Sequence, residues 1–245
     1  MARNIKCISF CLYGENPLYS DGLIENLKFC NIVYPTWQPI VYLEERKDAE
    51  LRPVLQSHGA QVVAVQGSHL SERQLLIQGM FWRLKALSIS DASHVIFRDC
   101  DSRVSQREAL AVQCWLDSNK DFHFMYDHLY HTVPILGGMW GCRGGMLPDI
   151  ETTIECFHSR FAAEDPYWPQ CDQSFLKEFV WNTLVQDNNY LAHGSQELRV
   201  FYQDNNIHVV PFPTNYNTYN NQDSHGGFVG KTVMTSASLP KPQKK

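Results

Sequence analysis

Short apolar segments alternate with helical segments over residues 5–65, and this alternation constrains the fold more than any other feature. Residues 5–12, 39–43 and 61–65 are rich in β-branched and apolar side chains and predict buried strands. Between them, Leu23 and Leu27 recur at helical spacing, and residues 51–55 mark a second helix. Strands that are joined through helices pair in parallel by right-handed crossovers. The sequence therefore predicts a parallel α/β half sheet of the nucleotide-binding type.

The rest of the chain continues the same pattern less regularly. Periodicity and capping signals predict helices over 71–89, from Ser105 (with Glu108 completing a capping box), from Asp149 to 157, and from Asp172. Short apolar runs predict strands at 95–97, 122–126, 134–141 and 207–210. No internal repeat is found. The polar end, 236–245, predicts a flexible tail.

Composition excludes several classes of protein. With 21 Lys+Arg against 26 Asp+Glu, the net charge of −5 gives no broad cationic field, so we expect no nucleic-acid partner. No run approaches the roughly 18 apolar residues of a transmembrane segment, and the first residues do not form a signal h-region. The eight cysteines include no CxxC pair and predict reduced, mostly packed thiols. We expect a cytoplasmic protein.

Two aspartates follow the apolar strand at 95–97. Asp99 and Asp101 are separated by one residue, so their side chains project to the same side if the backbone is extended. Open α/β sheets bind ligands outside the carboxyl ends of their strands. Mg²⁺ is usually bound there by one or two carboxylates plus substrate phosphates. The pair predicts a site for Mg²⁺ or Mn²⁺ and a nucleoside diphosphate, and an ordinary loop is the alternative explanation.

The run from Phe81 to Asp101 resembles the helix, strand and DxD motif of GT-A glycosyltransferases. The resemblance implies an α/β fold of GT-A (Rossmann-like) type, in which a single domain has a mostly parallel central sheet flanked by helices. It also implies that Asp101 is a direct metal ligand and that Asp99 contacts the metal or the donor ribose. Arg83, on the preceding helix, would reach the nucleotide, and a solvated helix arginine is the alternative.

A second resemblance lies near the end of the chain. His225, two glycines and Lys231 are similar to the HxxGxxK ending of the retaining GT-A enzymes that include glycogenin. There the histidine is the third metal ligand and the lysine neutralises the leaving diphosphate. This sequence departs from the motif, with Phe228 at the glycine position and no Pro-Trp after Lys231. A histidine in a glycine-rich turn is the alternative explanation.

Further candidates lie on the acceptor side. Asp172 and Gln173 resemble the Asp-Gln dipeptide that heads a helix in many GT-A enzymes. Asp172 is the candidate base for an inverting reaction, or holds donor hydroxyls in a retaining one with Gln173 near the anomeric carbon, or only caps its helix. Asp127 is the alternative base. The donor-binding candidates also include Gly137 and Gly138, which would form the floor under the donor sugar, and Tyr13 in the loop after the first strand.

Together these residues predict a metal-dependent glycosyltransferase. It would move a hexose or pentose from a nucleoside-diphosphate sugar, expected to be UDP-linked, to a glycan, glycoconjugate or other hydroxyl acceptor. Its domain would span 1–235, with a nucleotide-sugar-binding half at 1–103 and an acceptor-side half at 104–235. The alternatives are a sugar nucleotidyltransferase and a non-catalytic carbohydrate-binding module. The first usually has a basic, glycine-rich loop after the first strand, whereas residues 13–17 contain one Gly and no Lys or Arg. The second leaves the DxD unexplained.

Overall fold

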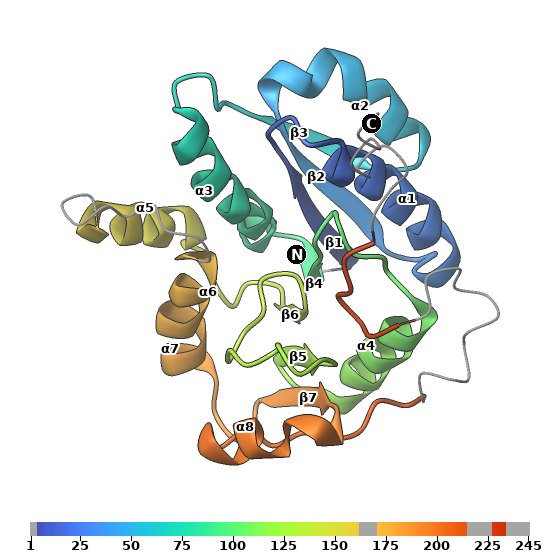
Figure 1. The fold of residues 1–245 in the computed structure, drawn as a ribbon, viewed down its shortest axis with the longest axis vertical. Helices are drawn as coiled ribbons and strands as arrows, with labels where there is room; N and C mark the ends of the chain where they lie inside the picture. Colours follow the sequence, from blue (N-terminus) through green and yellow to red (C-terminus); the bar gives the residue numbers. More distant parts are fainter. Residues whose placement is uncertain (1–3, 162–170, 215–226, 234–245) are drawn as a thin grey trace, which may run out of the picture.

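A central sheet with helices on both faces organises the part of the chain that the structure describes (Figure 1). The computed structural model describes residues 4–161, 171–214 and 227–233. Within these residues the sheet has seven strands in the order β3-β2-β1-β4-β6-β5-β7. Their bounds are β1(Ile5–Leu12), β2(Gln38–Glu44), β3(Gln61–Val65), β4(Ala92–Phe97), β5(Phe122–Tyr126), β6(Trp140–Arg143) and β7(Tyr190–Gly194).

The sheet is mostly parallel, as predicted. β1 pairs in parallel with β2 and β4, β2 with β3, and β5 with β7. β6 is antiparallel to both of its neighbours. The chain reaches β6 from β5 through a loop without the helix that a parallel crossover normally requires. Residues 134–139, which were predicted as part of this strand, belong to that loop.

Two sets of helices cover the two faces of the sheet. α1, α2 and α4 pack on one face through a cluster that contains Leu27, Leu55 and Trp115, and α3, α5 and α6 pack on the other. Figure 1 shows α1 and α2 on the side of the sheet opposite α3 and α5. The helices are α1(Pro17–Val33), α2(Asp48–Ser57), α3(Glu72–Trp82), α4(Gln106–Ser118), α5(Ile150–Phe161), α6(Cys171–Phe175), α7(Asn182–Leu184) and α8(Arg199–Asp204).

The predicted helix over 71–89 changes its winding before β4. α3 begins with a complete capping box between Ser71 and Gln74, and at Arg83 it tightens into a 3-10 turn that ends at Ser88. At α4, Ser105 Oγ accepts from the Glu108 N–H, as predicted. The Glu108 carboxylate instead accepts from Arg98 and Tyr34.

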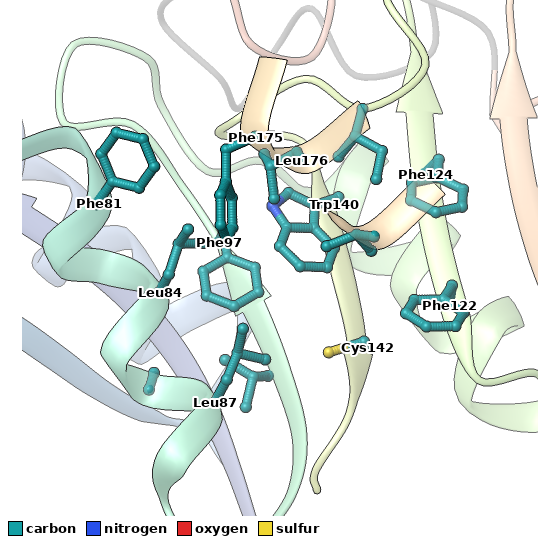
Figure 2. Close-up of a cluster of buried hydrophobic side chains, with 14 of the residues drawn as sticks. Phe81, Leu84, Leu87, Phe97, Phe122, Phe124, Trp140, Cys142, Phe175 and Leu176 are labelled. Atoms are coloured by element: carbon teal, nitrogen blue, oxygen red, sulfur yellow. The ribbon is translucent and has the colours of Figure 1, made fainter. Parts of the chain in front are cut away.

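Aromatic side chains fill the core between β4, β6 and α6 (Figure 2). Phe97 and Trp140 stack across the β4–β6 pair with their ring centroids 4.4 Å apart, and neither ring is exposed. Phe175 of α6 packs edge-on against Phe81 of α3, with centroids 5.5 Å apart. Because these rings join α3, β4 and α6, they fix the positions of these three elements relative to one another.

The late strand and one of the cysteines differ from the sequence predictions. The late strand at 207–210 is reduced to a single bridge between His193 and Val210, and the strand beside it is β7, which was not predicted. Cys114 of α4 is exposed, although most of the cysteines were predicted to be packed, whereas the neighbouring Trp115 is fully buried. All eight cysteines are free thiols, as predicted. The helices in the described part of the chain all lack the combined length and apolar character of a bilayer-spanning helix.

Candidate active site

The candidate site lies at the point where the order of the strands in the sheet reverses, between β1 and β4. β1 and β4 are adjacent, and the chain leaves β1 toward β2 on one side and β4 toward β5 on the other. These connections diverge and open a crevice at the carboxyl ends of β1 and β4. A cleft of about 850 Å³ occupies this position. Of the predicted site residues, it is lined by Tyr13, Arg83, Asp99, Asp101, Gly137, Asp172 and Gln173.

The loop that follows β1 forms one wall of the cleft. Gly14 has φ +71° and donates its backbone N–H to Glu44 Oε2 at 2.9 Å, so a buried carboxylate at the end of β2 holds the loop. The Tyr13 ring packs edge-on against Trp82 and lies directly over Gly79, where a Cβ would overlap it. Tyr13 is therefore fixed between β1 and α3.

Arg83 joins the two sides of the cleft. Its guanidinium pairs with Asp99 through Nη1 and with Asp172 Oδ2 through Nη2, the latter at 2.8 Å. Its backbone oxygen accepts from Ser9 Oγ of β1 at 2.7 Å. The side chain is 7% exposed, which excludes the solvated arginine of the alternative interpretation. The Arg83 guanidinium therefore holds Asp99 and the candidate base, Asp172, close together.

Two glycines allow the loop before β6 to approach this charged group. A Cβ at Gly137 would overlap the Arg83 guanidinium and lie 2.7 Å from Asp172 Oδ2. A Cβ at Gly138 would overlap the Asp99 carboxylate. The absent side chains leave room here for the charged side chains of Arg83, Asp99 and Asp172, and the predicted floor under a donor sugar stays a prediction.

Asp101 is held differently from Asp99. Its Oδ2 accepts from Thr232 Oγ1 at 3.2 Å, and its backbone oxygen accepts from the Val233 N–H at 2.8 Å. Burial, followed by the charge of Asp99, raises the pKa of the Asp101 carboxyl above its usual value. Within the described residues Asp101 forms no salt bridge, whereas Asp99 is paired with Arg83.

Asp99 and Asp101 are suited to a divalent cation that prefers oxygen ligands, such as Mg²⁺. No group of three or more His, Cys, Asp or Glu side chains suited to a metal occurs in the part of the chain that the structure describes. Two carboxylates completed by phosphate oxygens and water are a common way of binding Mg²⁺ or Mn²⁺ at substrate sites. Asp99 is 44% exposed at its side chain and lies with Asp101 on the cleft, which suits this arrangement.

Asp172 is the candidate base that reaches the cleft. Its side chain is only 6% exposed. Burial raises its pKa above the usual value, and the nearby Arg83 opposes that shift. Asp172 lies in the first turn of α6 as described, and its Oδ2 accepts from Arg83 Nη2, an interaction with another element that a helix cap alone does not explain. Gln173, next in the helix, also lines the cleft.

Asp127 lies elsewhere, and the prediction of it as an alternative base is not retained. Its carboxylate is fully buried and accepts two hydrogen bonds from Arg107, at 2.9 and 2.8 Å. Oδ2 also accepts from the Val229 N–H at 2.9 Å. With both oxygens bound by protein donors, Asp127 fixes the 227–233 segment to α4 and β5.

The late motif is described only in part. His225 lies outside the described residues, so its predicted role as a metal ligand stays a prediction. Lys231 is exposed and directly precedes Thr232, whose hydroxyl binds Asp101. Ser102 and Thr232 form an antiparallel bridge, which places the segment beside the DxD loop. The segment that resembles the HxxGxxK ending therefore runs past the candidate metal site.

Sequence reasoning missed residues that shape the cleft. Leu76, Ile77 and Met80 of α3 form an apolar wall, and Leu76 is 58% exposed. Tyr19 of α1 is 40% exposed at the same cleft. The sequence carried no signal for them, because Leu76 and Met80 stand at the same helical spacing as the buried Leu84 and Leu87 and were predicted to lie on one face with them.

Comparison with known proteins gives structural matches only. No protein-family profile and no curated protein sequence matches the chain. A glycosyltransferase involved in the glycosylation of the major capsid of PBCV-1 has a TM-score of 0.50 at 13% identity, covering 86% of this chain and 95% of that one. A 4-diphosphocytidyl-2C-methyl-D-erythritol synthase from Anaerococcus prevotii gives 0.46 at 14%, with coverage of 83% and 98%. A galactosyltransferase with bound donor and acceptor sugar analogues gives 0.46 at 14%, with coverage of 85% and 85%.

The first of these likenesses supports the fold. The chain has an α/β architecture with a mostly parallel seven-stranded sheet within the described residues, of the kind found in GT-A glycosyltransferases. At 13% identity the reaction does not follow from the fold, because one fold serves many reactions. The reaction has to be argued from the cleft.

Proposed function

We propose that this protein is a glycosyltransferase that takes its sugar from a nucleoside-diphosphate sugar, with UDP as the expected nucleotide. The observation that carries the proposal is the convergence of Asp99, Asp101, Arg83 and Asp172 on one cleft at the carboxyl ends of β1 and β4. The cleft volume of about 850 Å³ lies in the range of small-molecule sites. The similar fold of the glycosyltransferase involved in the glycosylation of the major capsid of PBCV-1 is consistent with this reaction.

The donor diphosphate is assigned to the DxD side of the cleft. Asp101, with Asp99 beside it, would hold Mn²⁺ or Mg²⁺, which when bound offsets the negative charge of the diphosphate. Arg83 keeps the Asp99 carboxylate oriented toward this side through their ion pair. Lys231, exposed beside Thr232, is the residue proposed to add positive charge near the leaving diphosphate. These charges would favour cleavage of the bond between the sugar and the diphosphate, because they do not have to reorient as negative charge develops on the leaving diphosphate.

The acceptor side is assigned to Asp172 and Gln173. In an inverting reaction, Asp172 takes the proton of the acceptor hydroxyl, and its raised pKa makes it a stronger base than an ordinary aspartate. In a retaining reaction, Asp172 accepts hydrogen bonds from donor sugar hydroxyls and Gln173 lies near the anomeric carbon. The Arg83 ion pair holds Asp172 in place in either case.

A nucleotidyltransferase is disfavoured by the loop after β1. Gly14 is its one glycine, its charged residue is Glu15, and its backbone is tied to the Glu44 carboxylate. A basic loop that cradles the triphosphate of a nucleotide would need free backbone donors and cationic side chains at this place. The loop supplies acidic charge instead.

A screen of nucleotide sugars tests the proposed function. The wild-type protein should hydrolyse at least one of them slowly in Mn²⁺ without an acceptor, and a chelator should stop the reaction. Proton NMR of the released sugar would give the anomer and so distinguish inversion from retention. Formation of a nucleotide sugar from a nucleoside triphosphate and a sugar phosphate would replace the proposal with nucleotidyl transfer. Metal-independent glycan binding without nucleotide affinity would replace it with a binding module.

A further inference from the structure

A buried asparagine on α1 faces the back of the DxD loop. Asn26 is 0% exposed and lies on the buried face of α1, between Leu23 and Leu27. A polar side chain in an apolar helix face is costly to bury unless its amide is fully hydrogen-bonded. Its hydrogen-bond partners therefore indicate why it is there.

The hydrogen bonds of its side chain go to the loop that carries the two aspartates. Asn26 Nδ2 donates to the backbone oxygens of Asp99 at 3.2 Å and Ser102 at 2.8 Å, with that of Cys100 at 3.5 Å. Asn26 Oδ1 accepts from the Val104 N–H at 3.0 Å. One side chain thus spans the turn from Asp99 to Val104.

The same face of α1 approaches the loop closely one turn earlier. A Cβ at Gly22 would overlap the Cys100 backbone oxygen and lie 2.9 Å from Arg103 Nη1. Gly22 and Asn26 are four residues apart and therefore lie on one side of the helix. The absent side chain at Gly22 lets the helix come near enough for the Asn26 amide to reach the carbonyls.

The loop needs these donors because it has left the sheet. Beyond Phe97, at the end of β4, the carbonyls of residues 99, 100 and 102 are not part of the strand ladder. Buried carbonyls without donors carry a desolvation cost, and the chain would relax to another turn geometry. Arg103 Nη1 also donates to the Ser102 and Cys100 oxygens, but it does so from within the loop itself. Asn26 supplies donors to these carbonyls from another element, α1.

We propose that Asn26 is the positioning residue that fixes the turn between Asp99 and Asp101, so that both carboxylates face the cation-bound diphosphate of the donor. The proposal rests on the proposed function, and it adds a helix outside the cleft to the machinery of donor binding. Supporting groups of this kind, behind metal-binding side chains, typically change metal affinity or activity by roughly 10- to 100-fold when they are removed.

Two substitutions separate the hydrogen bonds from the volume of the side chain. Asn26→Asp keeps the shape and the acceptor for Val104 but presents a carboxylate oxygen to three carbonyl oxygens, which repels the loop. Asn26→Ala removes both halves of the amide without adding charge. Asn31→Ala is the matched control, because Asn31 lies on the same helix and donates to the His58 backbone oxygen, away from the DxD loop.

The first readout is hydrogen exchange of the loop amides, which needs no substrate. In Asn26→Ala, exchange should become faster for residues 99–104, and most of all for the Val104 amide, which loses its acceptor. In Asn26→Asp, where it folds, exchange should become faster for residues 99–103, while the Val104 amide keeps an acceptor. The rest of β4 and α1 should keep the wild-type rates. Unchanged exchange in the loop would overturn the proposal, and so would faster exchange spread evenly over α1 and β4.

The second readout is the donor nucleotide, measured by calorimetry with UDP in Mn²⁺ and by the kinetics of donor hydrolysis. The Kd for UDP and the KM for the donor should rise roughly 10- to 100-fold in the Asn26 variants. The kcat should change less, because a folded variant with a displaced loop still reacts once loaded. Asn31→Ala should match the wild type.

The outcomes keep the two proposals apart. Tight UDP binding by the wild type together with equally tight binding by both Asn26 variants would leave the proposed function standing and overturn the role of Asn26. A wild type that binds no UDP in Mn²⁺ and hydrolyses no nucleotide sugar of the screen would overturn the proposed function and this role with it, even if the loop amides exchange faster in the variants.

Discussion

At the scale of single residues, the cleft is organised by one arginine that serves two acids. Arg83 and Asp172 are both almost fully buried, and a buried charge is tolerated only when it is paired and hydrogen-bonded. Asp99 receives the other half of the guanidinium while keeping a side chain that is 44% exposed. The acid that faces solvent is thus in the DxD, and the acid that is shielded from it is the candidate base.

Asp172→Asn tests the base at this scale. The amide keeps the size of the side chain but does not accept a proton, so kcat for transfer should fall by about 10²- to 10⁴-fold while KM for the donor changes much less. Steady-state kinetics with saturating acceptor would measure both constants. Asp149→Asn, at an exposed position ahead of α5, is the control. A variant with undiminished kcat would leave Asp172 with a positioning role only.

Some of these residues were predictable from the sequence and others were not. Asp99 and Asp101 stand out because they follow an apolar strand at alternating positions, and sheet geometry then places them at a ligand-binding edge. The pairing of Arg83 with Asp172 joins residues far apart in the chain, and no local pattern specifies it. Asp127 was misjudged for the same reason, since its partner Arg107 lies on another element. Asn26 carried a local signal, a polar residue inside an apolar helix face.

At the scale of elements, the loop between β5 and β6 matters as much as the strands. It brings Gly137 and Gly138 against the charged side chains of three other elements. The pattern of strands and helices up to β5 was predictable because hydrophobic periodicity reports burial directly. β7 was not, because Tyr190–Gly194 is buried on both faces and contains a histidine and a glycine in place of an alternating apolar pattern.

Gly138→Ala tests the role of this loop. The added methyl group overlaps the Asp99 carboxylate, so Asp99 has to move away from its place beside Asp101. A displacement of about 1 Å in a reacting group costs on the order of 100-fold in rate. Donor hydrolysis should fall by this order while the circular dichroism spectrum stays that of the wild type. Gly67→Ala, where the methyl group meets the Leu75 side chain at 3.0 Å, should keep its activity. Full activity in Gly138→Ala would contradict the close approach described here.

At the scale of the whole molecule, two histidines are buried side by side on β5 and β7, at the end of the sheet away from the cleft. His123 Nε2 and His193 Nδ1 are 2.9 Å apart on β5 and β7, and the Trp115 ring stacks on His123. Burial, and then the charge of Arg107, lowers the pKa of His193 from 6.5 to about 4. Phe212 also packs on His193. The folded protein therefore holds His193 neutral, whereas the unfolded chain protonates it near its ordinary pKa.

The stability of the fold should consequently fall in acid. Below pH 6.5 the unfolded chain binds more protons at His193 than the folded one, so the free energy of unfolding decreases as the pH drops toward 4, by about 3 kcal/mol for this residue. Urea unfolding at pH 7 and pH 5 would measure the loss. Between the two pH values, the free energy of unfolding should fall less in His193→Gln than in the wild type. In His69→Gln, a change at an exposed loop position, it should fall as much as in the wild type. An equal loss in His193→Gln and the wild type would assign the acid sensitivity to other groups.

Calorimetry with UDP tests the central claim, that the DxD pair binds a cation and through it a pyrophosphate. The wild type should bind UDP in Mn²⁺ and lose that binding when the metal is chelated. Asp101→Ala should abolish the metal-dependent part of the binding and keep the wild-type melting temperature, and Asp117→Ala, on the exposed face of α4, should bind as the wild type does. Metal-dependent UDP binding of undiminished affinity in Asp101→Ala would contradict the account.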